Sequence, residues 1–115
     1  MNYKSSKGFA SEEEYDAIVD VLNEYGEENL ISFEECFDSI HLNFNEDGRI
    51  VLSFKLSNEM SFFELSWDNG PALTLTTKRK CTTAGIGGME MEMVGILSAR
   101  YLEVLSDVED VIKEY

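Results

Sequence analysis

The chain has 115 residues, of which 23 are Asp or Glu and 9 are Lys or Arg, so its formal net charge is -14. This charge argues against direct binding of nucleic acid or of an anionic membrane, and it favours a basic protein surface as the partner. The hydrophobic content of 43% argues against a disordered chain, and the length fits a single domain.

The first predicted element is a helix that begins after Ser11 and ends at Gly26. Residues 1–10 show no periodicity and are expected to form a mobile tail, which leaves residues 11–115 as a single α+β domain. Ser11 and Glu14 have the spacing of a capping box, in which each side chain accepts a hydrogen bond from a free backbone N–H. Apolar residues then recur at helical spacing up to Gly26, a residue type that commonly ends helices.

The segment 27–39 allows a short second helix before the first strand. Ser32 is a candidate N-cap for that helix. This helix would bury four apolar residues, Phe33, Cys36, Phe37 and Ile40.

Alternation of apolar and polar residues predicts a series of strands between Ile40 and Lys78. The strands are expected at residues 40–44, 50–56, 60–67 and 72–78, with turn-forming residues at 45–48, 57–59 and 68–71. Short connections between successive strands predict an antiparallel meander.

The C-terminal part is predicted to be a Gly-rich connector followed by a long helix. Residues 89–93 alternate Met and Glu, and they could form either a fifth strand or the start of the helix. An apolar stripe from Leu97 to Tyr115 has the spacing of one helix face. A second capping-box pattern at Ser106 predicts a break or kink at that position.

The predicted fold class is α+β, with two layers. One layer is an antiparallel meander of four strands, or of five if residues 89–93 add one, and the N-terminal and C-terminal helices pack on one face of it. The predicted core residues are Ile18, Leu22, Leu42, Phe44, Leu52, Phe54, Leu65, Leu75, Leu97, Leu105, Val108 and Ile112.

Two rows of carboxylates are the candidate partner-binding residues. They are Glu13, Asp16, Asp20 and Glu24 on the first helix, and Glu103, Asp107, Asp110 and Glu114 on the last. Steps of four residues separate charges by roughly 6 Å along a helix axis. Thirteen acids lie between Glu12 and Asp47, and no Lys or Arg occurs from Gly8 to Gly48, whereas a solvated helix face ordinarily mixes both signs. Solubility alone is the alternative explanation of this acidity.

The leading functional hypothesis is a non-enzymatic inhibitor of a basic, nucleic-acid-binding protein, such as a nuclease or a host-defence effector. Its carboxylate rows would stand in for phosphates. In acidity and size alone, the chain resembles phage anti-restriction and anti-CRISPR proteins and the immunity proteins of nuclease toxins. The alternative is an acidic cytoplasmic chaperone or adaptor for a secreted or basic partner, with Phe33, Phe37 and Phe63 forming a dimer or client surface. A monomer favours the inhibitor, and an obligate dimer favours the chaperone.

No catalytic, metal or cofactor site is predicted. Cys36, His41 and Cys81 lack the spacing of a zinc site, and two cysteines are too few for a disulfide framework. The basic cluster 78–80 precedes a Gly-rich segment but lacks the Gly-Lys-Ser/Thr of a phosphate-binding loop. The chain shows neither a signal segment nor a run of about 18 apolar residues. We therefore expect a cytoplasmic protein, in the host cytoplasm if the protein is viral.

Overall fold

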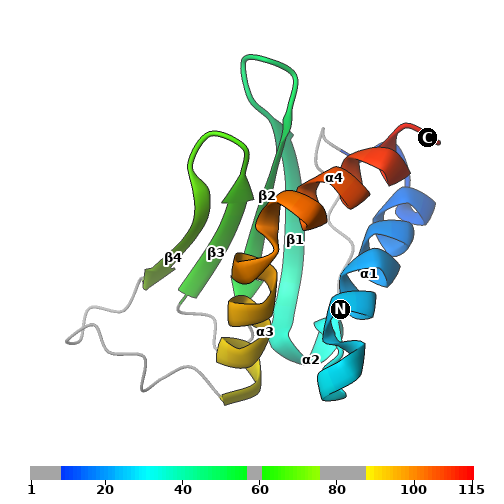
Figure 1. The fold of residues 1–115 in the computed structure, drawn as a ribbon. Helices are drawn as coiled ribbons and strands as arrows, with labels where there is room; N and C mark the ends of the chain where they lie inside the picture. The colour runs from blue at the N-terminus through cyan, green and yellow to red at the C-terminus, as the bar shows by residue number, and fades with distance from the viewer. Residues whose placement is uncertain (1–8, 57–60, 76–87) are drawn as a thin grey trace.

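A computed structural model describes residues 9–56, 61–75 and 88–115, which form an antiparallel sheet with helices on one face (Figure 1). The strands are β1 (Phe37–Phe44), β2 (Ile50–Leu56), β3 (Ser61–Ser66) and β4 (Gly70–Leu75), and they neighbour one another in chain order. The helices are α1 (Glu12–Gly26), the 3-10 helix η1 (Glu27–Asn29), α2 (Phe33–Cys36), α3 (Gly88–Ala99) and α4 (Tyr101–Ile112). The predicted α+β meander is confirmed, and residues 89–93 belong to a helix.

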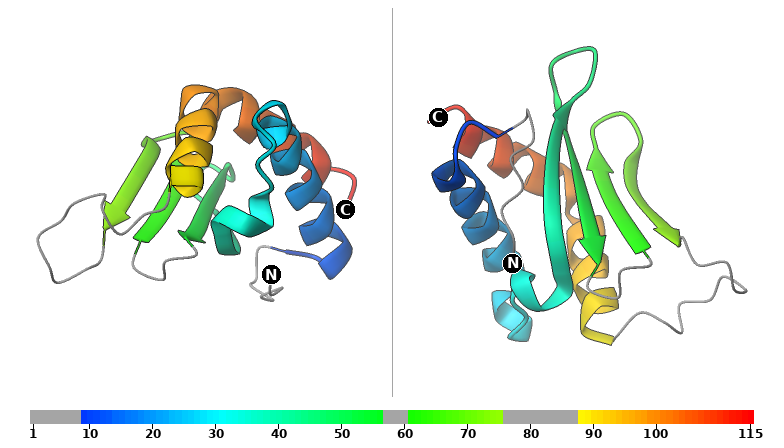
Figure 2. Two further views of the ribbon diagram at one scale, coloured as in Figure 1. Left: turned by 90° about the horizontal axis from the view of Figure 1, so that it is seen from below. Right: turned by 180° about the vertical axis from the view of Figure 1, so that it is seen from behind.

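Two layers follow from the period of two in the strands. Along β2, Ile50, Leu52, Phe54 and Leu56 are buried, while the residues between them are partly exposed. Seen from behind, in the right panel of Figure 2, the strands lie in front of α3 and of part of α4, while α1 lies beside β1. One face of the sheet therefore packs on helices, and no helix of the described ranges covers the other face, which is the usual arrangement of an antiparallel sheet.

Four phenylalanine rings form the centre of the core. Phe33 of α2, Phe37 of β1, Phe54 of β2 and Phe63 of β3 are at most 1% exposed, and contacting rings have their centroids 4.8–6.4 Å apart. Each such ring pair adds about 0.5–1.5 kcal/mol beyond the burial of its area. The suggestion that Phe33, Phe37 and Phe63 form a dimer or client surface is therefore wrong.

Most of the predicted core is buried, and the side chain of Leu75 lies outside the described part of the structure. The predicted residues that are buried are Ile18, Leu22, Leu42, Leu52, Phe54, Leu65, Leu97, Leu105 and Val108. Ile112, in the last turn of α4, is partly buried against this core. The prediction for Phe44 is wrong, because this residue is 49% exposed. Phe44 is the last residue of an edge strand, where the β1–β2 hairpin extends past the helices (Figure 1).

The C-terminal helical region breaks at Arg100 and not at Ser106. Arg100 has φ -122° and ψ 29°, outside the helical range, whereas Ser106 lies inside α4. The break separates two packing directions, because α3 contacts α1 and α2, while α4 crosses to α1, β3 and β4. A straight helix could not bring both apolar stripes to the core, so the predicted position of the kink is wrong.

The start of α1 has the predicted capping interactions. The Ser11 hydroxyl accepts a hydrogen bond from the Glu14 N–H at 3.1 Å, and the Glu14 carboxylate accepts one from the Ala10 N–H at 2.7 Å. Phe9 is buried and packs edge-on against Tyr15, with 5.3 Å between ring centroids. Phe9 and Ala10, at the end of the predicted tail, thus contact the domain. The remaining tail residues 1–8, the basic cluster 78–80 and Cys81 lie outside the described residues.

Candidate partner-binding site

The connection from α1 to α2 begins with a close backbone contact at Gly26. The Ile31 N–H donates to the Gly26 carbonyl at 2.9 Å. A Cβ atom on residue 26 would lie 2.4 Å from the Ile31 carbonyl oxygen, which only glycine avoids. Leu30, between them, has φ 57° and ψ 37°, and it is the single non-glycine residue with positive φ in the described part of the chain. The chain thus reverses within five residues and brings α2 back beside α1.

Asn23 fixes α2 against α1. Its side-chain oxygen accepts a hydrogen bond from the Phe33 N–H at 2.5 Å, and its amide nitrogen donates to the Glu34 carboxylate at 3.0 Å. Ser32 occupies the N-cap position, but its side chain makes no capping hydrogen bond. The N-terminus of α2 is therefore capped from α1, an interaction that sequence spacing could not reveal.

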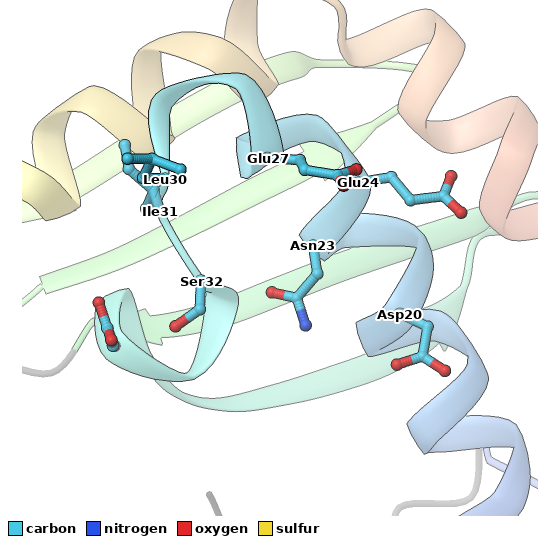
Figure 3. Close-up of a pocket in the computed structure, with 8 residues that line it drawn as sticks. Asp20, Asn23, Glu24, Glu27, Leu30, Ile31 and Ser32 are labelled. Atoms are coloured by element: carbon cyan, nitrogen blue, oxygen red, sulfur yellow. The ribbon is translucent and has the colours of Figure 1, made fainter.

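An open hollow of about 460 Å³ lies between α1 and α2 (Figure 3). Figure 3 shows side chains from three elements around it: Asp20 and Asn23 on α1, Leu30 and Ile31 on the connecting loop, and Ser32 at the start of α2. A second hollow of about 420 Å³ shares Asp20 and Asn23 with the first, so the two form one surface. The carboxylates along this surface, which we call the acidic cleft, are Asp16, Asp20, Glu24, Glu27, Glu34 and Glu35.

The carboxylates of the acidic cleft are exposed, and no cation of the described residues pairs with them. All six side chains are exposed, and none forms an ion pair with any residue in the described ranges. Glu34 accepts the hydrogen bond from Asn23. Because like charges at this spacing repel one another, the cleft is a region of concentrated negative potential. Asp16, Asp20 and Glu24 of the predicted α1 row belong to it, whereas Glu13 lines neither hollow.

The predicted α4 row has a different environment, because most of its acids have partners within the chain. Glu103 pairs with Arg100, and Asp110 lies 3.9 Å from the Lys113 ammonium nitrogen. Asp107 accepts a hydrogen bond from the Tyr25 hydroxyl. Burial and this hydrogen bond raise the pKa of Tyr25, which keeps the phenol protonated as the donor. Glu114, at the end of the row, is exposed.

The two predicted rows meet at one small hollow and do not form a continuous surface. This hollow, of about 140 Å³, is lined by Glu24 of α1, by Glu103 and Asp107 of α4, and by Tyr25 and Arg100. The guanidinium of Arg100 lies 4.6 Å from the centre of the Tyr25 ring. Arg100 pairs with Glu103 and the Tyr25 hydroxyl donates to Asp107, so Glu24 is the one carboxylate of this hollow without a described partner.

Glu109 was not predicted to matter, yet it makes the densest polar contacts described. It accepts hydrogen bonds from two guanidinium nitrogens of Arg49, each at 3.0 Å, from the Ile50 N–H at 3.2 Å and from the Trp67 indole at 3.0 Å. Arg49 also stacks on Trp67, 4.0 Å from the ring centre. Burial alone would raise the pKa of Glu109, but these donors outweigh it and lower the pKa below 4.5. Glu109 therefore connects α4 to β2 and to the end of β3.

Cys36 is a buried structural thiol. Its Sγ atom lies 3.7 Å from the Met89 carbonyl oxygen, and burial followed by repulsion from nearby glutamates raises its pKa to about 11. A thiol with this pKa stays protonated at neutral pH and is a poor nucleophile or metal ligand. No group of three or more His, Cys, Asp and Glu side chains in the described ranges is arranged to hold a metal ion. Within these ranges, no helix is long and apolar enough to cross a membrane.

The hairpin turn predicted at residues 45–48 is confirmed, and it lies between β1 and β2. The Asn45 side-chain oxygen accepts hydrogen bonds from the backbone N–H groups of Asp47 and Arg49, both at 2.9 Å, and Gly48 has φ 77°. The Asn45 oxygen therefore stabilises the turn through two backbone N–H groups. Comparisons with protein-family models, with curated proteins and with solved structures find no match to this chain, and the acidic cleft is interpreted from its own geometry.

Proposed function

We propose that this protein is a non-enzymatic binder that inhibits a basic, nucleic-acid-binding protein, such as a nuclease or a host-defence effector, in the cytoplasm. The observation that carries the proposal is the unpaired charge of the acidic cleft. Six exposed carboxylates from α1, η1 and α2 converge on it without an ion pair to any described residue. A protein that needed acids only for solubility would gain nothing from gathering them on one surface, where they repel one another.

The arrangement supports a phosphate surrogate. Asp16, Asp20 and Glu24 follow one another at four-residue steps, which places their charges roughly 6 Å apart along α1. Glu34 and Glu35 of α2 add a second line of charge on the other side of the cleft. A protein surface that binds nucleic acid presents Arg and Lys side chains, and these form charge-assisted hydrogen bonds with carboxylates as well as with phosphates.

The test is a comparison of three double variants with equal changes in net charge. The protein is used to capture its partner from the native cell or its host, and the nucleic-acid binding of the captured partner is measured with and without the protein. Asp16→Lys with Asp20→Lys should abolish capture and inhibition, because each desolvated pair lost costs on the order of 2–5 kcal/mol. Glu103→Lys with Asp107→Lys tests the α4 row.

The matched control is Glu46→Lys with Asp47→Lys. These two acids are exposed in the β1–β2 turn and line none of the hollows between the helices. Equal loss of binding in all three variants would mean that total charge, and not the cleft, determines association. Unchanged binding in all three would mean that the acidity serves solubility, and the proposal would be wrong.

The chaperone alternative is weaker after the fold is known, because the phenylalanines assigned to its client surface are buried in the core. Solution mass separates the two functions further. A monomer that captures a nucleic-acid-binding protein supports the inhibitor, while an obligate dimer that captures a secreted protein supports the chaperone.

A further inference from the structure

Leu30 is the most exposed large apolar residue in the described part of the chain, and it lies on the wall of the acidic cleft. Leu30 is 90% exposed, compared with 51% for Leu102, the next most exposed. Figure 3 shows Leu30 on the loop that connects α1 to α2, at the same hollow as Glu24 and Glu27. A leucine in full contact with water loses the stabilisation that burial of its side chain would give.

The backbone at Leu30 adds a second cost. Its φ of 57° is in the left-handed region, where glycine and asparagine are the favoured residues after a helical turn. The geometry is set by its neighbours, since Ile31 must turn inward to reach 6% exposure and to bond to Gly26. Glycine or asparagine at position 30 would serve this turn at lower cost. The sequence therefore retains a leucine where neither the turn nor the core uses its side chain.

We infer that Leu30 is the apolar anchor of the acidic cleft, and that the partner segment bound there is a basic one that carries a large apolar residue beside a Lys or Arg. This inference rests on the proposed function and states the chemistry of its partner more narrowly.

Charge complementarity selects this occupant. Glu24, Glu27 and Glu35 line the same hollow as Leu30, so a purely apolar segment would leave these carboxylates desolvated and unpaired. An Arg or Lys side chain resolves this conflict, because its aliphatic stem can lie on Leu30 while its charged end reaches a carboxylate. An apolar neighbour on the partner then covers the rest of Leu30. Apolar contacts surrounded by polar ones are the usual anatomy of an interface hot spot.

The experiment uses the full chain and two synthetic peptides of equal length and equal arginine content. One peptide has leucines between its arginines, and the other has serines in their place. Affinity and the methyl spectrum of the protein are measured by NMR titration at low salt. We expect the leucine peptide to bind about tenfold more tightly and to shift the Leu30 methyl signals, because covering roughly half of a leucine side chain supplies about this factor.

The decisive variant is Leu30→Asn, which suits the left-handed backbone. It should remove the tenfold difference between the peptides, mainly by weakening the leucine peptide, while the serine peptide, which places only arginine stems on Leu30, should weaken much less. Leu102→Asn is the matched control, since Leu102 is an exposed leucine on α4 that lines none of the hollows described. This control should keep the full difference between the two peptides.

The possible failures are distinguishable. If both peptides bind the native chain equally, or if Leu30→Asn keeps the tenfold difference, the anchor is wrong while the proposed function still stands. If neither peptide binds, the cleft does not take a basic segment, and both proposals are wrong. Asp16→Lys with Asp20→Lys should weaken both peptides alike, which separates the charge of the cleft from the apolar contact.

Discussion

The helices α1 and α4 carry similar rows of acidic residues, but the fold surrounds the two rows with different partners. On α4, Glu103 pairs with Arg100, Asp107 with Tyr25, and Glu109 with Arg49 and Trp67. On α1, Asp16, Asp20 and Glu24 form no ion pair with any described residue.

The difference arises from where the basic residues lie. Four basic residues are described, and three of them, Arg49, Arg100 and Lys113, pair with acids of α4. The fourth, Lys55, lies on β2. Two residues before it on the same strand, the Ser53 hydroxyl donates a hydrogen bond to Glu64 of β3. The helix α1 thus has acids without counter-charges among these residues. A row of carboxylates in a sequence therefore becomes a candidate binding surface only when the fold leaves it without internal cations.

The largest effect that distinguishes the two helices should come from Glu109→Ala. Removing this carboxylate leaves the Trp67 indole, the Ile50 N–H and the Arg49 guanidinium without their common acceptor. Loss of an acceptor shared by two partly buried donors, the indole and the Ile50 N–H, and by the exposed guanidinium costs about 2–3 kcal/mol of unfolding free energy. Urea unfolding followed by circular dichroism measures this loss.

The matched control is Glu24→Ala on α1, where the glutamate is exposed and unpaired among the described residues. Its effect should stay within about 0.5 kcal/mol. If Glu24→Ala destabilises the protein as much as Glu109→Ala does, the acids of α1 have a structural role and the contrast between the helices disappears.

A smaller effect is expected in the pH dependence of Glu109. The contacts of this residue lower its pKa in the folded protein below the value of 4.5 that it has when unperturbed. Its contribution to stability is therefore present above that value and is lost as pH falls through the folded pKa. The difference in unfolding free energy between the native chain and Glu109→Gln should be full at about pH 7 and should shrink toward about pH 3. Glu13→Gln is the control, and its difference should be small at both values.

A difference between the native chain and Glu109→Gln that stays constant across this range would contradict the assignment. In that case, the geometry of the hydrogen bonds and not the charge of Glu109 would account for the stabilisation. A contribution from the charge must change as the carboxylate titrates, whereas a contribution from hydrogen-bond geometry does not.

The local patterns predicted the elements well because each is determined by neighbours in the sequence. The cap at Ser11, the end of α1 at Gly26 and the hairpin turn at Asn45 all depend on bonds within a few residues. The alternation in β2 likewise identified its buried face. Such features follow from period and turn chemistry alone.

The features that the sequence did not predict depend on contacts between distant segments. The break at Arg100 is needed because α3 and α4 pack against different elements. No residue pattern around position 100 predicts it. The cluster of Phe33, Phe37, Phe54 and Phe63 was not predicted as a unit, because its ring contacts join α2 to β1, β2 and β3.

The candidate site shows the same division. The acids of α1 were predicted from their spacing, but their convergence with Glu34 and Glu35 depends on Asn23, which caps α2 from another helix. Leu30 carried no periodic signal, since its importance lies in a backbone angle and an exposed fraction. The pairing of Glu109 could have been suspected only from the need of a tryptophan indole for an acceptor.

The smallest expected effect concerns salt and tests the unpaired charge of α1 directly. Stability of the native chain should rise as NaCl increases from roughly 0.02 to 0.3 M, because screening relieves the repulsion among exposed acids over distances of about 10 Å. Asp16→Asn with Asp20→Asn should raise the melting temperature at low salt and reduce this gain, since each like-charge pair costs a few tenths of a kcal/mol. Glu103→Gln with Asp110→Asn should not, because these acids already have Arg100 and Lys113 beside them. Thermal unfolding at several salt concentrations measures all three proteins. A melting temperature that falls steadily with NaCl would show that ion pairs such as those of α4, and not the unpaired acids of α1, dominate the electrostatics of the fold.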